Sequence, residues 1–135
     1  MYLNIEETLT KLEMLQAQFP GCGEVFTRRE QTEENRDVWA LRVKTNSGQA
    51  KHGILIIAGL HAREWGNTDI VIFFIEEILN AYNASSDLVL GNKTYTAAEI
   101  QSIVDNLDIF IVPVTNPDGK HFSFQDGNDE KGEPK

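Results

Sequence analysis

Hydrophobic residues recur along this chain with two different periods, and the change of period separates helices from strands. Apolar positions near helical spacing predict an amphipathic helix over residues 5–18, which Pro20-Gly21 would end. Residues 23–31 and 37–46 each alternate apolar and polar side chains. This alternation is typical of half-buried strands, so the two segments predict a β-hairpin.

Two later segments, residues 53–59 and 107–114, are apolar at almost every position. Each is too short for a helix, and the pattern predicts central strands buried on both faces. Between them, residues 67–83 have helical spacing, and 96–106 open with a Thr-x-x-Glu capping box. Residues 85–94 read as a polar loop. A strand, a helix and a strand in this order predict parallel pairing through a right-handed crossover.

The helix predicted over residues 67–83 has a specific expected orientation. Asn67 or Thr68 would cap its first turn. The side chains expected on its apolar side are Ile70, Phe73, Phe74, Ile78 and Tyr82.

The predicted fold class is α/β, a partial mixed β-sheet with flanking helices on both faces. Three helices and four strands would still leave one side of the sheet unpaired and exposed. Residues 1–124 are expected to form the folded part of the chain. Residues 125–135 contain no apolar side chain, so we expect them to be disordered.

Charge and composition narrow the possible partners. Asp and Glu total 21 against 12 Lys and Arg, a net charge of −9, which argues against binding to nucleic acid or to an anionic membrane. The start of the sequence has no secretory signal pattern, and no segment is apolar over a membrane-spanning length, so the sequence as read indicates a cytoplasmic protein. Its single cysteine excludes an intrachain disulfide, and the oligomeric state is left open.

The most polar and sharply turning segments follow the two apolar strands. His61-Ala62-Arg63-Glu64-Trp65 follows the first strand, and Thr115 to Gly119 follows the second. Because parallel strands end at the same edge of a sheet, both segments are expected at one site. His61 and Glu64 are three residues apart, as neighbours on one helical turn are, and imidazole and carboxylate are zinc ligands. A catalytic zinc needs a third protein ligand, so spacing alone leaves a locally hydrogen-bonded His61 and a helix-terminal Glu64 as alternatives.

These two segments, in this order, resemble the signatures of the zinc metallocarboxypeptidases of the carboxypeptidase A/B type. His61 to Trp65 resembles the metal-binding motif, Val114 to Gly119 resembles a later turn of the family, and the resemblance runs over about residues 2–124. It implies the N-terminal part of the family's α/β/α fold, with His61 and Glu64 as ligands of Zn²⁺. It also implies that Arg63 contacts the substrate backbone, that Trp65 packs, and that residues 116–119 form a rigid turn. The implied substrates are the C-termini of peptides and proteins.

The same resemblance implies a third zinc histidine and a general-base glutamate beyond the second motif, and neither can be placed in this chain. No catalytic residue is therefore assigned. His52 precedes the strand that His61 follows, so it is expected about 20 Å away. His121 lies at the right edge, but a surface histidine is the commoner case.

Three functions therefore remain open at this stage. The first is a zinc-dependent carboxypeptidase that releases C-terminal amino acids, with the isolated chain expected to be inactive. The second is a non-catalytic remnant that binds peptides or partners, or has no role. The third is a zinc amidohydrolase acting on small acylated amino acids, which the Arg-Glu-Trp run disfavours.

Overall fold

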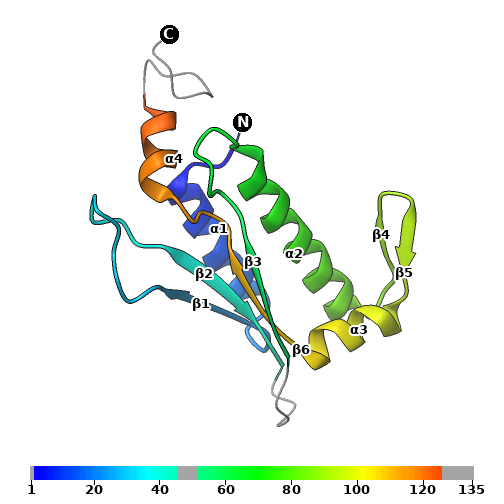
Figure 1. Cartoon of the computed structure of the whole chain (residues 1–135). Helices are drawn as coiled ribbons and strands as arrows, with labels where there is room; N and C mark the ends of the chain where they lie inside the picture. Colours follow the sequence, from blue (N-terminus) through cyan, green and yellow to red (C-terminus); the bar gives the residue numbers. More distant parts are fainter. Residues whose placement is uncertain (1, 46–51, 126–135) are drawn as a thin grey trace.

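The computed structural model describes residues 2–45 and 52–125, which form four helices and six strands (Figure 1). In chain order the elements are α1 (Ile5–Gln18), β1 (Gly23–Thr27), β2 (Trp39–Val43), β3 (His52–Ile57), α2 (Gly66–Ala84), β4 (Leu88–Leu90), β5 (Lys93–Tyr95), α3 (Ala97–Asn106), β6 (Leu107–Val112) and α4 (Pro117–Phe124). The expected tail of residues 125–135 lies outside the described residues apart from Gln125.

Four of the strands form one mixed sheet in the order β1-β2-β6-β3. β1 pairs antiparallel with β2, β2 pairs antiparallel with β6, and β6 pairs parallel with β3. The predicted hairpin and the predicted parallel pair are both confirmed. β6 therefore lies between two strands that precede it in the sequence.

One face of this sheet carries the core. The pairing register puts Val25, Leu41, Ile111 and Ile56 in one row across the strands. Because side chains alternate between faces, this row and its neighbours two residues away face the same side. That side packs against α1, α2 and α3, whose buried residues include Leu12, Leu15, Ile75, Leu79, Ile100 and Val104.

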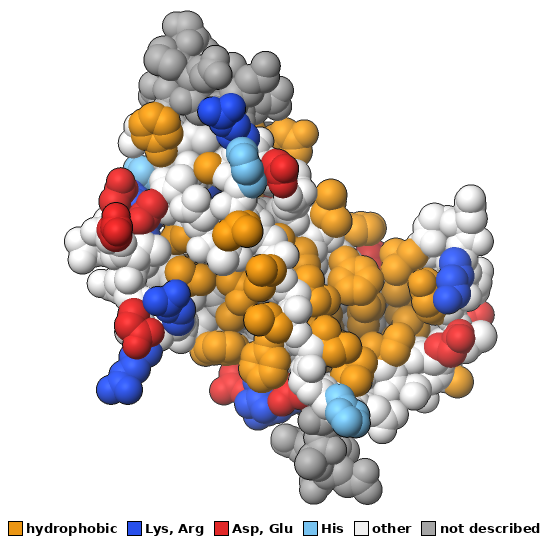
Figure 2. All heavy atoms as spheres, viewed as in Figure 1, with side chains coloured by type: hydrophobic (Ala, Val, Ile, Leu, Met, Phe, Trp, Pro, Cys, Tyr) orange, Lys and Arg blue, Asp and Glu red, His pale blue; other side chains and the backbone are white. Residues whose placement is uncertain are grey.

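The opposite face of the sheet is exposed among the described residues, so the expectation of helices on both faces is wrong for this part of the chain. Leu55 is 65% exposed, and it lines an apolar groove with Phe26, Ala40, Phe110 and Val112. Figure 2 shows hydrophobic side chains gathered over the strands and the adjoining part of α2. The expectation of an unpaired side concerns the sheet's edge, and among the described residues β3 forms such an edge.

β3 is an edge strand here and not the buried central strand that its composition predicted. Just beyond its end, Ala58 donates its N–H to Val112 O and accepts from Thr115 N, so both of its backbone groups face the β6 side. By the two-residue period, Leu55 and Ile57 direct their backbone groups away from β6. A run of apolar residues without charge at such an edge is unusual, because exposed edges are normally protected by charge or proline.

α2 forms as predicted, and its buried side agrees with the prediction in part, because Ile78 is buried and Phe74 and Tyr82 pack against the core. Val71, Ile72, Ile75, Ile78 and Leu79 face the core. By contrast, Ile70 and Phe73, which the sequence pattern placed on the buried side, are 68% and 56% exposed. No helix in the described part of the chain is long and apolar enough to cross a membrane.

The start of α2 also differs from its prediction, because neither Asn67 nor Thr68 caps it. The helix begins after Trp65 without a side-chain cap. Thr68 instead lies fully buried in the first turn, where its hydroxyl donates to Pro113 O.

The polar segment predicted as a loop over residues 85–94 contains a small hairpin. β4 and β5 pair antiparallel around Gly91, whose φ is +60°. A Gly-Asn pair between two short strands is a known signal for a two-residue hairpin turn. α3 then begins at the predicted capping box, where Thr96 accepts from Glu99 N and the Glu99 carboxylate accepts from Thr96 N.

Tyr82 links α2 to α3 and should be detectable by titration. Its hydroxyl donates to Asp105 Oδ1 over 2.8 Å. Burial, with the hydrogen bond to Asp105, raises the pKa of Tyr82 to about 12. Since the folded pKa lies above the ordinary value near 10, this group stabilises the fold fully below about pH 10 and loses its contribution as pH rises through 12. Ultraviolet titration should show one tyrosine ionising late, and Tyr82→Phe should remove that step.

Candidate metal site

The segment His61 to Trp65 connects β3 to α2 at the carboxyl end of the parallel pair. His61, Arg63 and Glu64 are exposed, whereas Ala62 and Trp65 are half-buried. The loop therefore presents three polar side chains to solvent, and its other two side chains pack against the rest of the protein. This is the edge of the sheet where the sequence placed the site.

His61 and Glu64 occupy one turn of backbone, because Glu64 N–H donates to His61 O over 3.2 Å. His61 Nδ1 accepts only a long 3.4 Å contact from Arg63 N–H, and Glu64 Oε2 accepts from Asn67 Nδ2 over 2.6 Å. Both alternatives to metal binding thus have support, a locally bonded histidine and a carboxylate at a helix start. The donor types fit zinc. Within residues 2–45 and 52–125, however, no three His, Cys, Asp or Glu side chains form a group that could hold a metal ion.

The second motif begins a helix and is not the rigid turn that its proline and glycine predicted. α4 starts at Pro117, and Asn116 caps it by accepting from Gly119 N–H over 2.9 Å. Proline at the first helical position and asparagine at the cap are a favoured helix start. This reading of Asn-Pro-Asp-Gly could have been made from the sequence.

α4 and the residues before it bind the backbone of the His61 loop. Thr115 N–H donates to Ala58 O, and Asn116 N–H donates to Gly59 O, each over 3.0 Å. Gly119 lies so close that a Cβ there would be 2.9 Å from the Ala62 Cβ. The loop is consequently held against α4 from both its start and its middle.

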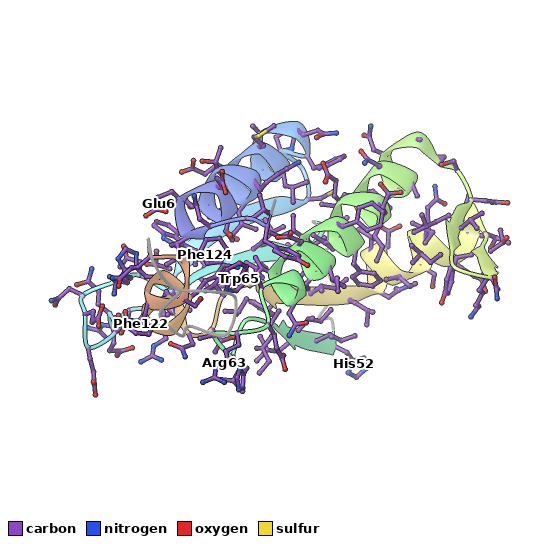
Figure 3. The ribbon with its side chains drawn as sticks, turned by 90° about the horizontal axis from the view of Figure 1, so that it is seen from above. Glu6, His52, Arg63, Trp65, Phe122 and Phe124 are labelled. Atoms are coloured by element: carbon purple, nitrogen blue, oxygen red, sulfur yellow. The ribbon has the colours of Figure 1, made fainter. Side chains whose placement is uncertain are left out.

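Trp65 packs, as the sequence predicted. Its ring lies 4.3 Å from the Phe124 ring and 6.0 Å from the Tyr2 ring, and its indole N–H donates to Ser123 Oγ over 2.8 Å. Figure 3 shows Trp65 and Phe124 together, with Arg63 and Phe122 at the same end of the molecule.

Asp118 joins α4 to the segment between β1 and β2. Its carboxylate accepts from Thr32 Oγ1 over 2.8 Å, from Arg36 Nη1 over 2.9 Å and from Glu34 N over 3.3 Å. Burial alone would raise the pKa of Asp118, but these hydrogen bonds outweigh it and leave the pKa below its usual value. No local sequence pattern connects Asp118 to these partners, because each lies more than 80 residues from it in the chain.

Lys120 is the one charged side chain among the buried polar residues of the described chain, at 3% exposure. Its Nζ donates to Thr68 Oγ1 over 2.9 Å and lies 5.3 Å from the Phe124 ring centre. Burial lowers the pKa of Lys120, although Asp69 acts in the opposite direction. No motif or spacing in the sequence predicted the burial of Lys120.

The other two histidines do not join His61. His52 opens β3 opposite Leu107, whereas the His61 loop follows the far end of that strand, so His52 lies at the other end as predicted. His121 is half-exposed in α4 and lines a cavity with Asn4, Glu6 and Phe124. It forms no metal group with His61 and Glu64 among the described residues.

Comparison with known proteins supports the resemblance seen in the sequence. The family model described as zinc carboxypeptidase matches residues 8–134. Metallocarboxypeptidase A of Trichophyton rubrum is 32% identical over 123 residues, and inactive metallocarboxypeptidase ECM14 of Saccharomyces cerevisiae is 30% identical over 126 residues. These alignments cover 90% and 91% of this chain but 26% of each relative, so the chain spans about a quarter of their length.

Comparison with solved structures points to the same family. The crystal structure of carboxypeptidase A from Helicoverpa armigera superposes with a TM-score of 0.71 and 25% identity, over 96% of this chain and 28% of that one. The partial mixed sheet and its flanking helices are thus those of a carboxypeptidase. The chain belongs to the zinc carboxypeptidase family.

Proposed function

We propose that this chain contributes His61 and Glu64 to the zinc site of a metallocarboxypeptidase that releases C-terminal amino acids from peptides. The observation that carries the proposal is the position of the His61 loop. It follows the parallel pair β3–β6 at its carboxyl end, it is bound by α4, and it presents both donor side chains to solvent. The chain's membership of the family supports the same assignment.

Within this site the side chains have separate roles. His61 and Glu64 would hold the metal, which when bound would polarise the scissile carbonyl and lower the pKa of a water ligand. Arg63 is exposed beside them, and its planar guanidinium suits bidentate binding to peptide carbonyl or carboxylate oxygens. We assign no general base among the described residues.

A second candidate is a non-catalytic chain that binds peptides or other partners. Two observations favour it. No group of three metal-binding side chains exists in the described part of the chain, and a relative of similar identity is named an inactive metallocarboxypeptidase. Zinc binding and hydrolysis must therefore be measured separately.

Zinc titration of the isolated chain against a chromophoric chelator tests the site. We expect His61→Ala and Glu64→Gln each to weaken zinc binding at least tenfold, because each removes one of the two ligands proposed among the described residues. His52→Ala is the matched control and should bind zinc as the wild type does, since His52 lies at the other end of β3. Equal affinity for all four proteins would contradict the proposed site.

Hydrolysis separates the two candidates. Release of C-terminal residues from a peptide, inhibited by a chelator and abolished by His61→Ala, would support the enzyme. Zinc binding that depends on His61 without any release would support the non-catalytic candidate.

A further inference from the structure

The hydroxyl of Ser123 lies at a junction between α4 and the His61 loop. Ser123 is 1% exposed. Its Oγ accepts from Trp65 Nε1 over 2.8 Å and lies within hydrogen-bonding distance of Ala62 O, at 3.1 Å, and of Lys120 O, at 3.0 Å. The hydroxyl thus accepts from the indole, and its single proton is shared between two carbonyl oxygens or donated to one of them at a time.

The two loop residues that Ser123 contacts have a particular place in the sequence. Ala62 directly follows His61, and Trp65 directly follows Glu64. Because Ser123 Oγ contacts both of these residues, it fixes the backbone on either side of the turn that carries the two proposed zinc ligands. The backbone contacts from Thr115 and Asn116 hold only the entry to this loop, at Ala58 and Gly59.

We propose that Ser123 is a positioning residue for the metal site, which sets the relative placement of His61 and Glu64 through Ala62 O and the Trp65 indole. This inference rests on the proposed zinc site. Removing the hydroxyl would leave a half-buried indole N–H without its acceptor. The backbone of the turn would also lose the side-chain hydrogen bond to Ala62 O that the second half of α4 provides. Groups that orient metal ligands in this indirect way typically change metal affinity by 10- to 100-fold.

The test compares Ser123→Ala with a control of reduced stability. Val104→Ala removes methyl groups from a fully buried site in α3, far along the chain from the loop, and should destabilise without touching it. We expect Ser123→Ala to weaken zinc binding about tenfold and Val104→Ala to leave it unchanged at a temperature where both are folded. If both variants unfold at a lower temperature and neither binds zinc more weakly, the role of Ser123 is purely structural and the proposal is overturned.

A second measurement does not depend on metal. Nuclear magnetic resonance relaxation of the metal-free chain should show increased motion at residues 60–65 in Ser123→Ala, and no such change in Val104→Ala. Unchanged motion at these residues would overturn the proposal even if the wild type binds no zinc. Absence of zinc binding by the wild type would instead contradict the proposed function, so the two failures are distinguishable.

A double-mutant cycle with Trp65→Phe identifies the route. That variant removes the indole N–H and keeps an aromatic ring against Phe124. If Ser123 acts through Trp65, the effects of the two substitutions on zinc affinity should be less than additive. Fully additive effects would show that the hydroxyl does not act through the indole, and would overturn that part of the proposal.

Discussion

Gly59→Ala should lower the free energy of unfolding by about 3 kcal/mol. Gly59 has φ +59°, which an L residue adopts at a cost of about 1–2 kcal/mol. An added Cβ would also lie 2.9 Å from Pro113 O and 3.0 Å from the Val114 Cα, both of them backbone atoms that cannot move aside cheaply. Urea denaturation followed by circular dichroism measures the loss.

Gly91→Ala provides a matched control for this effect. Gly91 has nearly the same backbone conformation, with φ +60°, but no atom lies within 4 Å of an added Cβ. Its substitution should therefore cost only the conformational part, about 1–2 kcal/mol. A loss at Gly59 no larger than the loss at Gly91 would show that Pro113 and Val114, which follow β6, do not lie this close to the start of the His61 loop.

Lys120→Met should stabilise the chain by about 2 kcal/mol, because it replaces a buried ammonium with an apolar side chain of similar length. The exchange leaves no donor without a partner, since Thr68 Oγ1 keeps its bond to Pro113 O. The contacts of the side chain with the Phe124 ring remain available to the thioether. Thermal and urea denaturation of the two proteins at neutral pH measure the difference, and a destabilised variant would contradict this view of Lys120.

The pH dependence of this difference has a definite sign. Because the folded pKa of Lys120 is lowered, the unfolded chain binds more protons than the folded chain between the folded pKa and about 10.4. The penalty for burying the charge is therefore complete at low pH and declines as pH rises through that window. The gain from Lys120→Met should shrink as pH rises above the lowered folded pKa of Lys120 toward about 10, and a constant gain would show that charge is not its cause.

The sheet could be predicted from the sequence to the extent that its strands have distinct patterns. The alternation in β1 and β2 and the continuous apolar runs of β3 and β6 identified four strands and both kinds of pairing. The apolar run of β3 predicted a buried central strand, and this was wrong because composition does not show whether another strand pairs with the far side of β3. The buried side of α2 was misassigned in part, since Ile70 and Phe73 fit a helical stripe as well as Val71 and Ile75 do.

At the candidate site, the order of the two apolar strands was enough to place the His61 loop at the carboxyl end of the parallel pair, and tertiary contacts supplied the rest. Reading Asn116 to Gly119 as a turn hid α4, and with it the positions of Lys120 and Ser123. Asp118 is paired with residues that no local pattern connects to it. Metal ligation by His61 and Glu64 stays a prediction, which the zinc titration tests.

The position of β6 between β2 and β3 has a consequence for the order of events on the ribosome. β2 and β3 follow one another in the sequence, yet both pair with β6 in the finished sheet. Neither pairing can form until residues 107–112 have been synthesised. During that interval the apolar β3 segment must stay away from the hairpin that precedes it, or pair with it wrongly. Slow translation after β3 would lengthen this exposure, and a chaperone that binds short apolar segments should recognise the nascent chain before residue 107 emerges and release it afterwards.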